Sequence, residues 1–431
     1  MREDIKKRIE QIRRGEVPVG YTRTKEGVLP LKWKEKRLGQ LAEVIMGQSP
    51  SSKHYNTNNE GKPLIQGNND RTDRESDPKV WTTQITKECK TGDILMSVRA
   101  PVGTVFKSRH NACIGRGICA IRSVYSDYLF QFLIFHEDRW RKNAQGSTFE
   151  SINRNEIESK EIPFCERDYL EIAETLSTCD RVIDLKKKLI EEKKKVKKWL
   201  MQTLLTGMIR VKDIENNTPY EELKRRINQI RNGQVPEGYW STKSGILPLE
   251  WKEKKLGKLG EVIMGQSPSS KHYNTNSEGK PLIQGNNDRT DKESDPKVWT
   301  TQITKECKTG DILMSVRAPV GKVFRSRHNA CIGRGICAIR SVHSDYLFQF
   351  LMFHEDKWGK TAQGSTFESI NRNEIESKDI PFCESDQGEI AEILSAADKE
   401  IDLLNKDLEQ WELKKKSLMQ LLLTGTVRTT A

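Results

Sequence analysis

Two stretches of this sequence carry the hydrophobic pattern of a long amphipathic helix. A helix spanning residues 169–205 would be roughly 55 Å long at ~1.5 Å per residue. In both stretches the apolar residues follow alternating three- and four-residue steps, which is the spacing of a coiled-coil seam. In the first they are Val182, Leu185, Leu189, Val196 and Trp199, with Glu192 as the exception. In the second they are Ile401, Leu404, Leu408, Trp411, Leu418 and Leu422, interrupted by Lys415. The pattern predicts two long helices that pack together and act as a spacer.

Shorter periodic segments precede each predicted long helix. Residues 4–14 and 222–232 are amphipathic stretches of helical spacing, and each is followed closely by a glycine. Between the short and the long helix, β-type runs such as residues 93–99 (DILMSVR) and 119–124 (CAIRSV) mix with a helical stretch at 127–140. This mixture predicts a compact α/β or α+β domain.

The whole pattern occurs twice. Residues 3–210 reappear as residues 221–428 without insertion or deletion, at a constant offset (Gly265 − Gly47 = 218). Residues 44–58 return unchanged as 262–276. A repeat this long is a domain duplication, because solenoid repeats are roughly 20 to 50 residues long. Two copies related by rotation suit a ligand that carries one feature twice, such as duplex DNA with inverted half-sites.

The repeat divides the chain into five parts. Residues 1–19 form a short helix, 20–166 the first globular domain, 167–237 a long helix with the following short one, 238–384 the second globular domain, and 385–431 the second long helix. The predicted fold class is therefore α/β (α+β), with two near-identical domains separated by two long antiparallel coiled-coil helices and related by a pseudo-twofold axis.

The charge balance favours a polyanionic partner. Lys and Arg number 73 against 61 Asp and Glu, giving a formal net charge of +12 and a pI of about 9.1. Basic composition predicts attraction to phosphate without predicting sequence specificity, so a merely soluble basic protein is the alternative at this point. Three exchanges between the copies keep the positive charge: Arg74 to Lys292, Lys107 to Arg325 and Arg139 to Lys357.

Cysteine usage and hydropathy indicate a reducing, non-membrane setting. The chain has 9 cysteines, an odd number, and they include no CxxC pair. Neither a disulfide framework nor a zinc ribbon is therefore supported. No apolar stretch approaches the ~20 residues of a membrane span. We therefore expect a cytoplasmic protein that does not bind a membrane.

Enzyme-like motifs fail on inspection. Residues 260–267 (GEVIMGQS) have the glycine spacing of a P-loop, but Gln266 stands where the lysine belongs and the first copy has Ala42 in place of Gly260. The ESK triplet at 158–160 resembles the distal half of a nuclease metal site, but no Pro-Asp pair precedes it at a suitable distance. The sequence contains neither a tetrapeptide for adenine methylation nor a glycine fingerprint for a methyl donor. We expect no catalytic residue and no metal ligand.

Candidate DNA contacts are polar side chains on exposed loops. Base edges are read by side chains with paired donors and acceptors. The candidates of that kind are Gln66, Asn68, Asn69 and Arg71, with Gln284, Asn286, Asn287 and Arg289 in the second copy. Plain turn chemistry is the alternative, because Gly-Asn-Asn-Asp is also a good turn.

Other candidates suit phosphate. A hydroxyl- and cation-bearing run comprises Gln48, Ser49, Ser51, Lys53, His54 and Tyr55, and in the second copy Gln266, Ser267, Ser269, Lys271, His272 and Tyr273. Arg99 and Arg317 either clamp phosphate or pair with a nearby carboxylate. Arg116 and Arg334 are stronger candidates, because flanking glycines let a backbone approach the duplex while the side chain points outward.

The motifs, in this order and twice over, resemble a known family. Each copy opens with LPLKWKEKRLGQLAEVIMGQSPSS or a near-copy, carries GDILMSVRAPVG in the middle, and closes with GSTFESINRNEIESK before a long helix that ends in LLTG. This pattern resembles the specificity subunits of type I restriction-modification systems over essentially the whole chain.

The resemblance implies a non-catalytic reader of double-stranded DNA. It implies two target recognition domains, each for one half of a bipartite site, and helices that space them and dock two methyltransferase subunits. It further implies restriction and translocation subunits in the holoenzyme, with S-adenosylmethionine, ATP and Mg²⁺ used by the partner subunits and no cofactor on this chain. Because the two domains are nearly identical, we expect an interrupted palindrome. The alternative is a twofold DNA-binding regulator or architectural protein; a self-contained nuclease or methyltransferase would need an active site that the sequence lacks.

Overall fold

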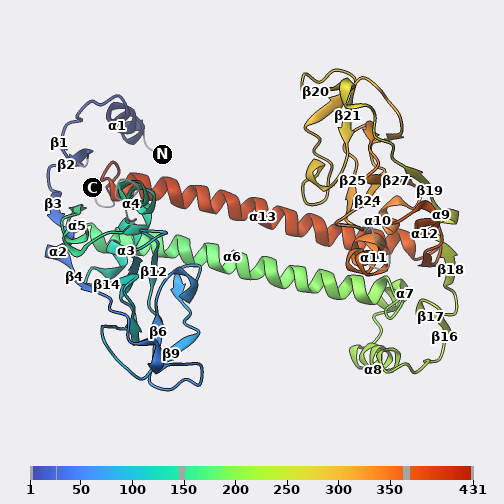
Figure 1. Ribbon diagram of the computed structural model, residues 1–431, viewed down its shortest axis with the longest axis horizontal. Coiled ribbons are helices and arrows are strands. Elements are labelled where there is room, and N and C mark those ends of the chain that lie inside the picture. The colour runs from blue at the N-terminus through green and yellow to red at the C-terminus, as the bar shows by residue number, and fades with distance from the viewer. Residues whose placement is uncertain (1–2, 26, 145–150, 363–368, 429–431) are drawn as a thin grey trace. The chain divides into compact units, whose positions relative to one another are not determined.

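The computed structural model describes residues 3–25, 27–144, 151–362 and 369–428 (Figure 1). The chain forms two compact units, Met1–Lys187 with Lys406–Ala431, and Lys188–Asn405. Each unit therefore combines one globular domain with part of both long helices. The mixed α/β class and the internal repeat are confirmed. The GSTFE portion of the closing motif, at 146–150 and 364–368, lies outside the described residues.

The globular domain of unit 1 is built on two sheets. The larger has the order β4 (Glu43–Met46), β14 (Ile118–Arg122), β11 (Ile94–Ser97), β12 (Val105–Lys107), β8 (Glu75–Ser76) and β7 (Arg71–Thr72). The second has the order β10 (Glu88–Cys89), β13 (Ala112–Ile114), β6 (Lys62–Ile65), β9 (Val80–Thr82) and β5 (Tyr55–Asn56). The runs at 93–99 and 119–124 are thus strands, as predicted.

Smaller elements complete unit 1. β1 (Tyr21–Thr24) and β2 (Gly27–Pro30) form a hairpin, and β3 (Lys34–Arg37) pairs with β15 (Glu161–Phe164). The helices are α1 (Glu3–Arg13), α2 (Leu38–Leu41), α3 (Ser126–Phe135), α4 (Glu137–Ala144) and α5 (Arg154–Glu158), with short 3-10 turns η1 (Ser52–His54) and η2 (Asn68–Asp70). The predicted helix at 127–140 is thus two helices, α3 and α4.

Unit 2 repeats this plan. One sheet has the order β19 (Glu261–Met264), β27 (Ile336–Arg340), β24 (Ile312–Ser315) and β25 (Val323–Arg325). The other has the order β20 (Tyr273–Asn274), β22 (Val298–Thr300), β21 (Lys280–Ile283), β26 (Ala330–Ile332) and β23 (Glu306–Cys307). Its strand pairs are β16 (Tyr239–Thr242) with β17 (Gly245–Pro248), and β18 (Lys252–Lys255) with β28 (Asp379–Phe382). Its shorter helices are α7 (Val211–Glu215), α8 (Tyr220–Arg231), α9 (Leu256–Leu259), α10 (Ser344–Phe353), α11 (Glu355–Ala362) and α12 (Arg372–Glu376), with η3 (Ser270–His272) and η4 (Asn286–Asp288).

Strand β11 is the centre of the unit 1 core. Successive strand residues point to opposite faces of a sheet. Ile94 and Met96 accordingly belong to the core cluster that contains the α3 residue Leu129, whereas Leu95 belongs to the cluster with Ile65 of the second sheet. Because both faces are covered, the strand is continuously apolar instead of alternating.

The two long helices are α6 (Tyr169–Leu204) and α13 (Gln387–Leu423). Within unit 2, Lys193 of α6 pairs with Glu400 of α13 at 2.6 Å. Within unit 1, Lys187 pairs with Glu412 at 3.7 Å. Residues later in α6 pair with residues earlier in α13. The two helices therefore run antiparallel in each unit, as predicted.

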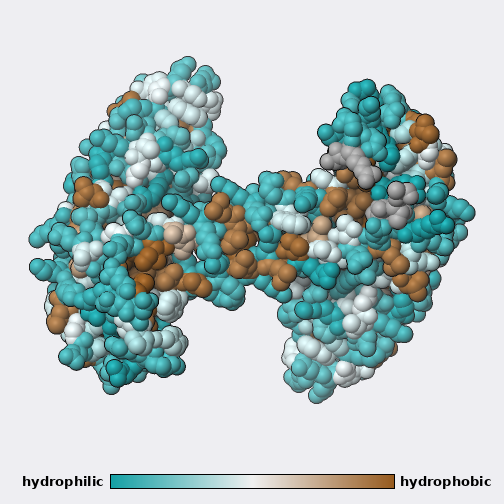
Figure 2. Space-filling model, turned by 180° about the vertical axis from the view of Figure 1, so that it is seen from behind, coloured by the Kyte–Doolittle hydropathy of each residue, from teal (hydrophilic) through white to brown (hydrophobic). Residues whose placement is uncertain are grey.

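The seam predicted for α6 is wrong. Leu185 is 65% exposed and Val196 51%, and Figure 2 shows hydrophobic residues at the surface of the long helices. The residues turned inward instead lie one position further along the sequence and follow the same steps: Ile183, Lys186, Ile190, Lys193, Lys197, Leu200 and Leu204. Their α13 counterparts are the predicted seam residues, including Ile401, Leu404 and Leu422, which are buried or half-buried. Lysines with carboxylate partners on α13 replace apolar residues in the α6 seam.

The C-terminal end of each long helix docks on a globular domain. In unit 2, Leu204 and Leu205 share a core cluster with Trp251, and the Tyr239 hydroxyl donates to the Gly207 carbonyl at 3.0 Å. In unit 1, Leu422 and Leu423 join Trp33 in the same way, and the Tyr21 hydroxyl donates to the Thr426 carbonyl at 3.3 Å. The last part of the chain therefore packs on the domain formed by its first part.

Candidate nucleic-acid interface

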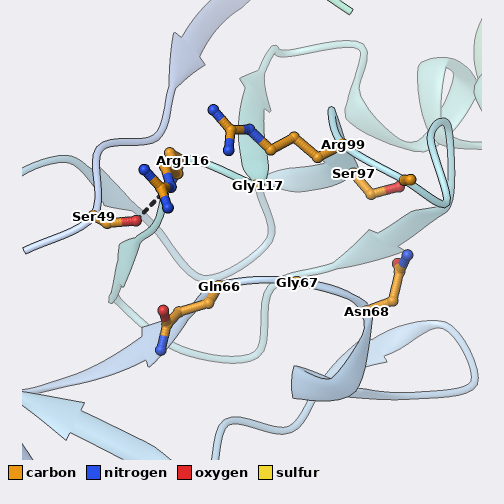
Figure 3. Close-up of a pocket in the computed structure, with 9 residues that line it drawn as sticks. Ser49, Gln66, Gly67, Asn68, Ser97, Arg99, Arg116 and Gly117 are labelled. Carbon is orange, nitrogen blue, oxygen red and sulfur yellow. Dashed lines mark hydrogen bonds between the residues drawn. The ribbon is translucent and has the colours of Figure 1, made fainter. Parts of the chain in front are cut away.

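A polar pocket opens at the edge of the unit 1 domain where three loops meet (Figure 3). The loops follow β4, β6 and β13, and the turn after β11 closes the opposite side. The lining residues are Ser49, Gln66, Gly67, Asn68, Ser97, Arg99, Ala100, Arg116 and Gly117. Five predicted DNA-contacting residues, Ser49, Gln66, Asn68, Arg99 and Arg116, thus come together from distant parts of the sequence. Sequence reasoning missed Ser97, for which the sequence offers no signal.

Glycines hold the Arg116 loop against the Gln66 loop. A Cβ atom on Gly117 would lie 2.4 Å from the Gln66 carbonyl oxygen, and one on Gly47 would lie 2.2 Å from the Gly115 carbonyl oxygen. The Arg116 amide donates to the Ser49 hydroxyl at 3.1 Å. The glycines were predicted to allow close approach to a duplex; in the structure, what they accommodate is the neighbouring loop backbone. The Arg116 side chain is exposed, as predicted.

The two arginines of the pocket keep their guanidinium groups available. Arg99 and Arg116 are both exposed, and within the described residues neither guanidinium has a hydrogen-bond or ion-pair partner. The alternative that Arg99 pairs with a nearby carboxylate therefore has no support in the described part of the chain. As donor-only groups, both suit an anionic or acceptor-rich ligand.

The loop of Gln66 and Asn68 is ordered by turn chemistry. The carboxylate of Asp70 accepts from the Gln66 amide at 2.7 Å and from the Gly67 amide at 3.1 Å. The side-chain amide of Asn68 donates to the Pro101 carbonyl at 3.1 Å, and its oxygen is buried without a partner. The Tyr55 hydroxyl lies 3.5 Å from Gln66 Oε1. The loop therefore forms a turn and also places the Gln66 and Asn68 side chains at the pocket.

The remaining candidates of unit 1 lie outside the pocket lining. Arg71 turns back to donate to the carbonyl of Asp73 in its own loop. His54 Nδ1 lies 3.4 Å from the Thr83 hydroxyl, and Lys53 is exposed. The others outside the lining are Gln48, Ser51, Tyr55 and Asn69.

Unit 2 reproduces the contacts of the pocket. The Arg334 amide donates to the Ser267 hydroxyl at 3.1 Å, and the Tyr273 hydroxyl lies 3.4 Å from Gln284 Oε1. Asn286 donates to the Pro319 carbonyl at 3.1 Å, and its side-chain oxygen is again buried without a partner. Arg317 takes the place of Arg99. The two units therefore offer the same arrangement of side chains.

Two of the charge-conserving exchanges have structural partners. Arg74 pairs with Glu137 at 2.5 Å, and Lys292 pairs with Asp398 at 2.7 Å. Lys107 and Arg325 each pair with an aspartate at the start of the following helix. These ion pairs explain why the positive charge is retained, so phosphate attraction is not needed to explain the exchanges.

A metal site and a reactive thiol each place requirements on the described residues. No group of three or more His, Cys, Asp or Glu residues there could hold a metal ion. Burial raises the pKa of both Cys119 and Cys337 to about 12, which leaves these thiols protonated and unreactive at neutral pH. No described helix has the length and apolar character required to span a membrane.

Comparisons with known proteins agree with this geometry. Residues 30–195 and 248–413 each match the type I restriction modification DNA specificity domain. The chain is 29% identical over 442 residues to a Methanocaldococcus jannaschii protein assigned as the MjaX type I restriction enzyme specificity subunit, covering 95% of this chain and 96% of that protein. The MjaVIII specificity subunit of the same organism is 24% identical over 328 residues, or 70% of each chain.

Solved structures share the fold. The S subunit of a type I restriction-modification system from M. genitalium superposes with a TM-score of 0.58 at 14% identity, covering 91% of this chain and 96% of that one. A chain from a study of the assembly and conformational transition of a type I system gives a TM-score of 0.56 at 19% identity, with 93% and 99% covered. With the specificity domain matched twice, at the spacing of the internal repeat, the chain belongs to the family of type I restriction-modification specificity subunits and carries two DNA-recognition domains.

Proposed function

We propose that the pocket of each unit faces double-stranded DNA and that each unit binds one half of a bipartite site. The observation that carries this proposal is the unit 1 pocket, whose two arginines have no guanidinium partner among the described residues. Unit 2 repeats the contacts that shape it, with Asp288 in the place of Asp70. The pocket residues are the same in both copies, so the two half-sites have the same sequence. A twofold arrangement of the units would then make the full site an interrupted palindrome.

The long helices serve as spacer and docking platform in this proposal. Two methyltransferase subunits bind there, and restriction and translocation subunits complete the enzyme. S-adenosylmethionine, ATP and Mg²⁺ are used by those partners, whereas this chain binds DNA and performs no chemistry. The free thiols suit the reducing cytoplasm.

The test is to map methylated adenines. The chain is combined with the methyltransferase subunit encoded beside it and S-adenosylmethionine, and methylation of genomic DNA is read by single-molecule sequencing. We expect an interrupted palindrome methylated on both strands. An asymmetric bipartite motif would keep the specificity role but refute the equivalence of the two units. Methylation that does not depend on this chain would favour a regulator or architectural protein.

A further inference from the structure

The open side of the unit 1 pocket presents more hydrogen-bond donors than acceptors. The guanidinium groups of Arg99 and Arg116 can only donate. Ser49 already accepts a hydrogen bond from the Arg116 amide, which leaves its hydroxyl proton to donate. Gln66 is exposed, and the Tyr55 hydroxyl 3.5 Å from its oxygen donates to the Pro50 carbonyl at 3.1 Å, so Gln66 offers a donor and an acceptor.

Most of the other acceptors near the pocket are already used or buried. Asp70 accepts from two backbone amides through one carboxylate oxygen. The Ser97 hydroxyl donates to the Pro101 carbonyl at 2.7 Å and accepts from the Thr104 amide at 2.9 Å. The Asn68 oxygen is buried. A ligand that must donate a hydrogen bond therefore finds little in the pocket to accept it.

This imbalance separates the four bases. In the major groove guanine presents two acceptors, N7 and O6, and thymine presents one, O4, beside its methyl group. Adenine presents N7 beside the N6 donor, and cytosine presents the N4 donor. Adenine and cytosine would leave their donor facing guanidinium groups, and an unmet polar group costs binding. Guanine can be met in full by one guanidinium, whose planar fork spans N7 and O6.

A phosphate is the competing acceptor-rich ligand, and the internal repeat argues against it as the main partner. Phosphate contacts need charge and not a planar fork. Where charge alone is needed, as at the carboxylate-paired positions Arg74 and Lys292, the repeat exchanges Arg for Lys. In the pocket both arginines stay arginine in both units. Arg116 is the better placed of the two for base contact, because the Ser49 hydrogen bond and the flanking glycines fix its backbone.

Resting on the proposed DNA-binding function, we propose that each pocket holds the major-groove edge of a guanine, read by Arg116 in one half-site and by Arg334 in the other. Each half of the recognised sequence then contains a required G·C pair. Arg99 and Arg317 supply further donors at the same edge or to the adjacent phosphate. The side chains in the two pockets are the same, so the required guanine occupies the same position in both halves.

The experiment removes single atoms from the DNA. After the wild-type motif has been mapped, duplexes with 7-deazaguanine at the conserved guanine of one half-site are tested for binding to the chain assembled with its methyltransferase subunit. Loss of N7 removes one acceptor, and we expect binding to weaken roughly tenfold. In R116A, 7-deazaguanine in one half-site should no longer weaken binding, and in R334A the same should hold for the other half-site. In each variant, methylation should tolerate other bases at that guanine position.

R116K separates base reading from phosphate contact. Lysine keeps the positive charge but lacks the fork, so we expect binding to the guanine site to weaken roughly tenfold, while binding to duplexes with another base at that position stays unchanged. Because the Arg116 side chain is exposed, we expect R116A to melt at the wild-type temperature. That result would show that the fold of the variant is intact.

The possible failures are distinguishable. A wild-type motif without a guanine in each half, or 7-deazaguanine that binds as well as guanine at every such position, overturns the guanine proposal and leaves the specificity role standing. Weaker binding of R116A to all sequences without relaxed choice assigns Arg116 to phosphate and also overturns it. Absence of any methylation that depends on this chain refutes the proposed function itself.

Discussion

Lys197 of α6 donates a hydrogen bond to Asp398 of α13 over 2.6 Å, and both side chains are nearly buried, at 11% and 13% exposure. Burial alone would raise the pKa of Asp398, but hydrogen bonds from Lys197, Lys292 and Gln349 outweigh it, so that the pKa lies below its usual value. The carboxylate therefore stays charged and links both long helices to the globular domain of unit 2. Asp180 has the same role in unit 1, with Lys415 and Gln131.

Replacing Lys197 by methionine should lower the free energy of unfolding of unit 2 by about 3 kcal/mol, because Asp398 keeps a buried charge with one cation fewer. Urea unfolding followed by circular dichroism measures the change. Lys195→Met is the matched control, since Lys195 lies on the same helix with its side chain 72% exposed. We expect no shift of the unfolding midpoint in the control. Equal shifts for both variants would show that Lys197 contributes only helix propensity.

The same pair explains why the α6 seam was mispredicted. Two stripes of α6 have the three- and four-residue spacing of a coiled coil, and the more hydrophobic one is exposed. The buried stripe contains Lys186, Lys193 and Lys197, whose partners come from α13. Sequence periodicity identified the helix and its length. It did not identify the side of α6 that faces α13, because the ion pairs that select this side depend on residues some 200 positions away. On α13 the apolar stripe and the buried stripe coincide, so the prediction there was right.

Gly207→Ala should destabilise unit 2 by about 3 kcal/mol. Gly207 has φ +68°, and a Cβ atom there would lie 2.5 Å from Pro248 Cδ. The substitution thus combines backbone strain with a clash where α6 docks on the β16–β17 hairpin. Gly15→Ala separates the two effects, because Gly15 has φ +79° but no atom within 4 Å of the added Cβ. It should cost about 1 kcal/mol. Thermal melting compares the two, and equal costs would mean that the clash is relieved without loss.

The candidate site shows a similar division between what sequence reveals and what it hides. Polar loops with Gln66, Asn68 and Arg116 were identified from residue chemistry alone. Their convergence depends on the parallel pairing of β13 with β6, which brings the ends of both strands together. The inward turn of Arg71 toward the Asp73 carbonyl also depends on loop geometry that composition does not encode. Residue type therefore predicts candidates, and strand pairing selects among them.

His354 should make the stability of unit 2 sensitive to acid. Burial lowers its pKa to about 4, and its Nδ1 lies 2.9 Å from the Phe350 carbonyl oxygen. In the unfolded chain the pKa is about 6.5. Between these values the unfolded state binds more protons, so stability falls as pH falls from about 6.5 to 4, by up to about 3 kcal/mol, and this loss stops below pH 4.

The difference between wild type and His354→Gln isolates this effect from the titration of carboxylates. Melting temperatures measured from pH 7.5 to 4 should fall more steeply for wild type than for the variant. Parallel curves over this range would show that His354 is protonated in the folded protein.

Lys292→Ala should loosen the loop that follows η4 without unfolding the domain. Lys292 reaches Asp398 of α13 at 2.7 Å, whereas its counterpart Arg74 pairs with Glu137 on α4. The difference arises because Lys322, which replaces Thr104, binds Glu355 at 3.0 Å and occupies the carboxylate equivalent to Glu137. Lys292 is thus available to anchor its loop to the long helix.

A hydrogen bond to a buried charge contributes about 1.5–3 kcal/mol, so removing it should speed amide exchange in residues 289–294 by at least tenfold. Hydrogen-exchange mass spectrometry measures this, with the exposed Lys297→Ala as control; Lys297 pairs only with the nearby Asp295 among the described residues. Arg74→Ala should change exchange in α4 and leave the long helices untouched, because Arg74 is bound to α4. Identical exchange in Lys292→Ala and wild type would mean that the loop holds its conformation through the backbone bonds of Thr290 and Ser294 alone.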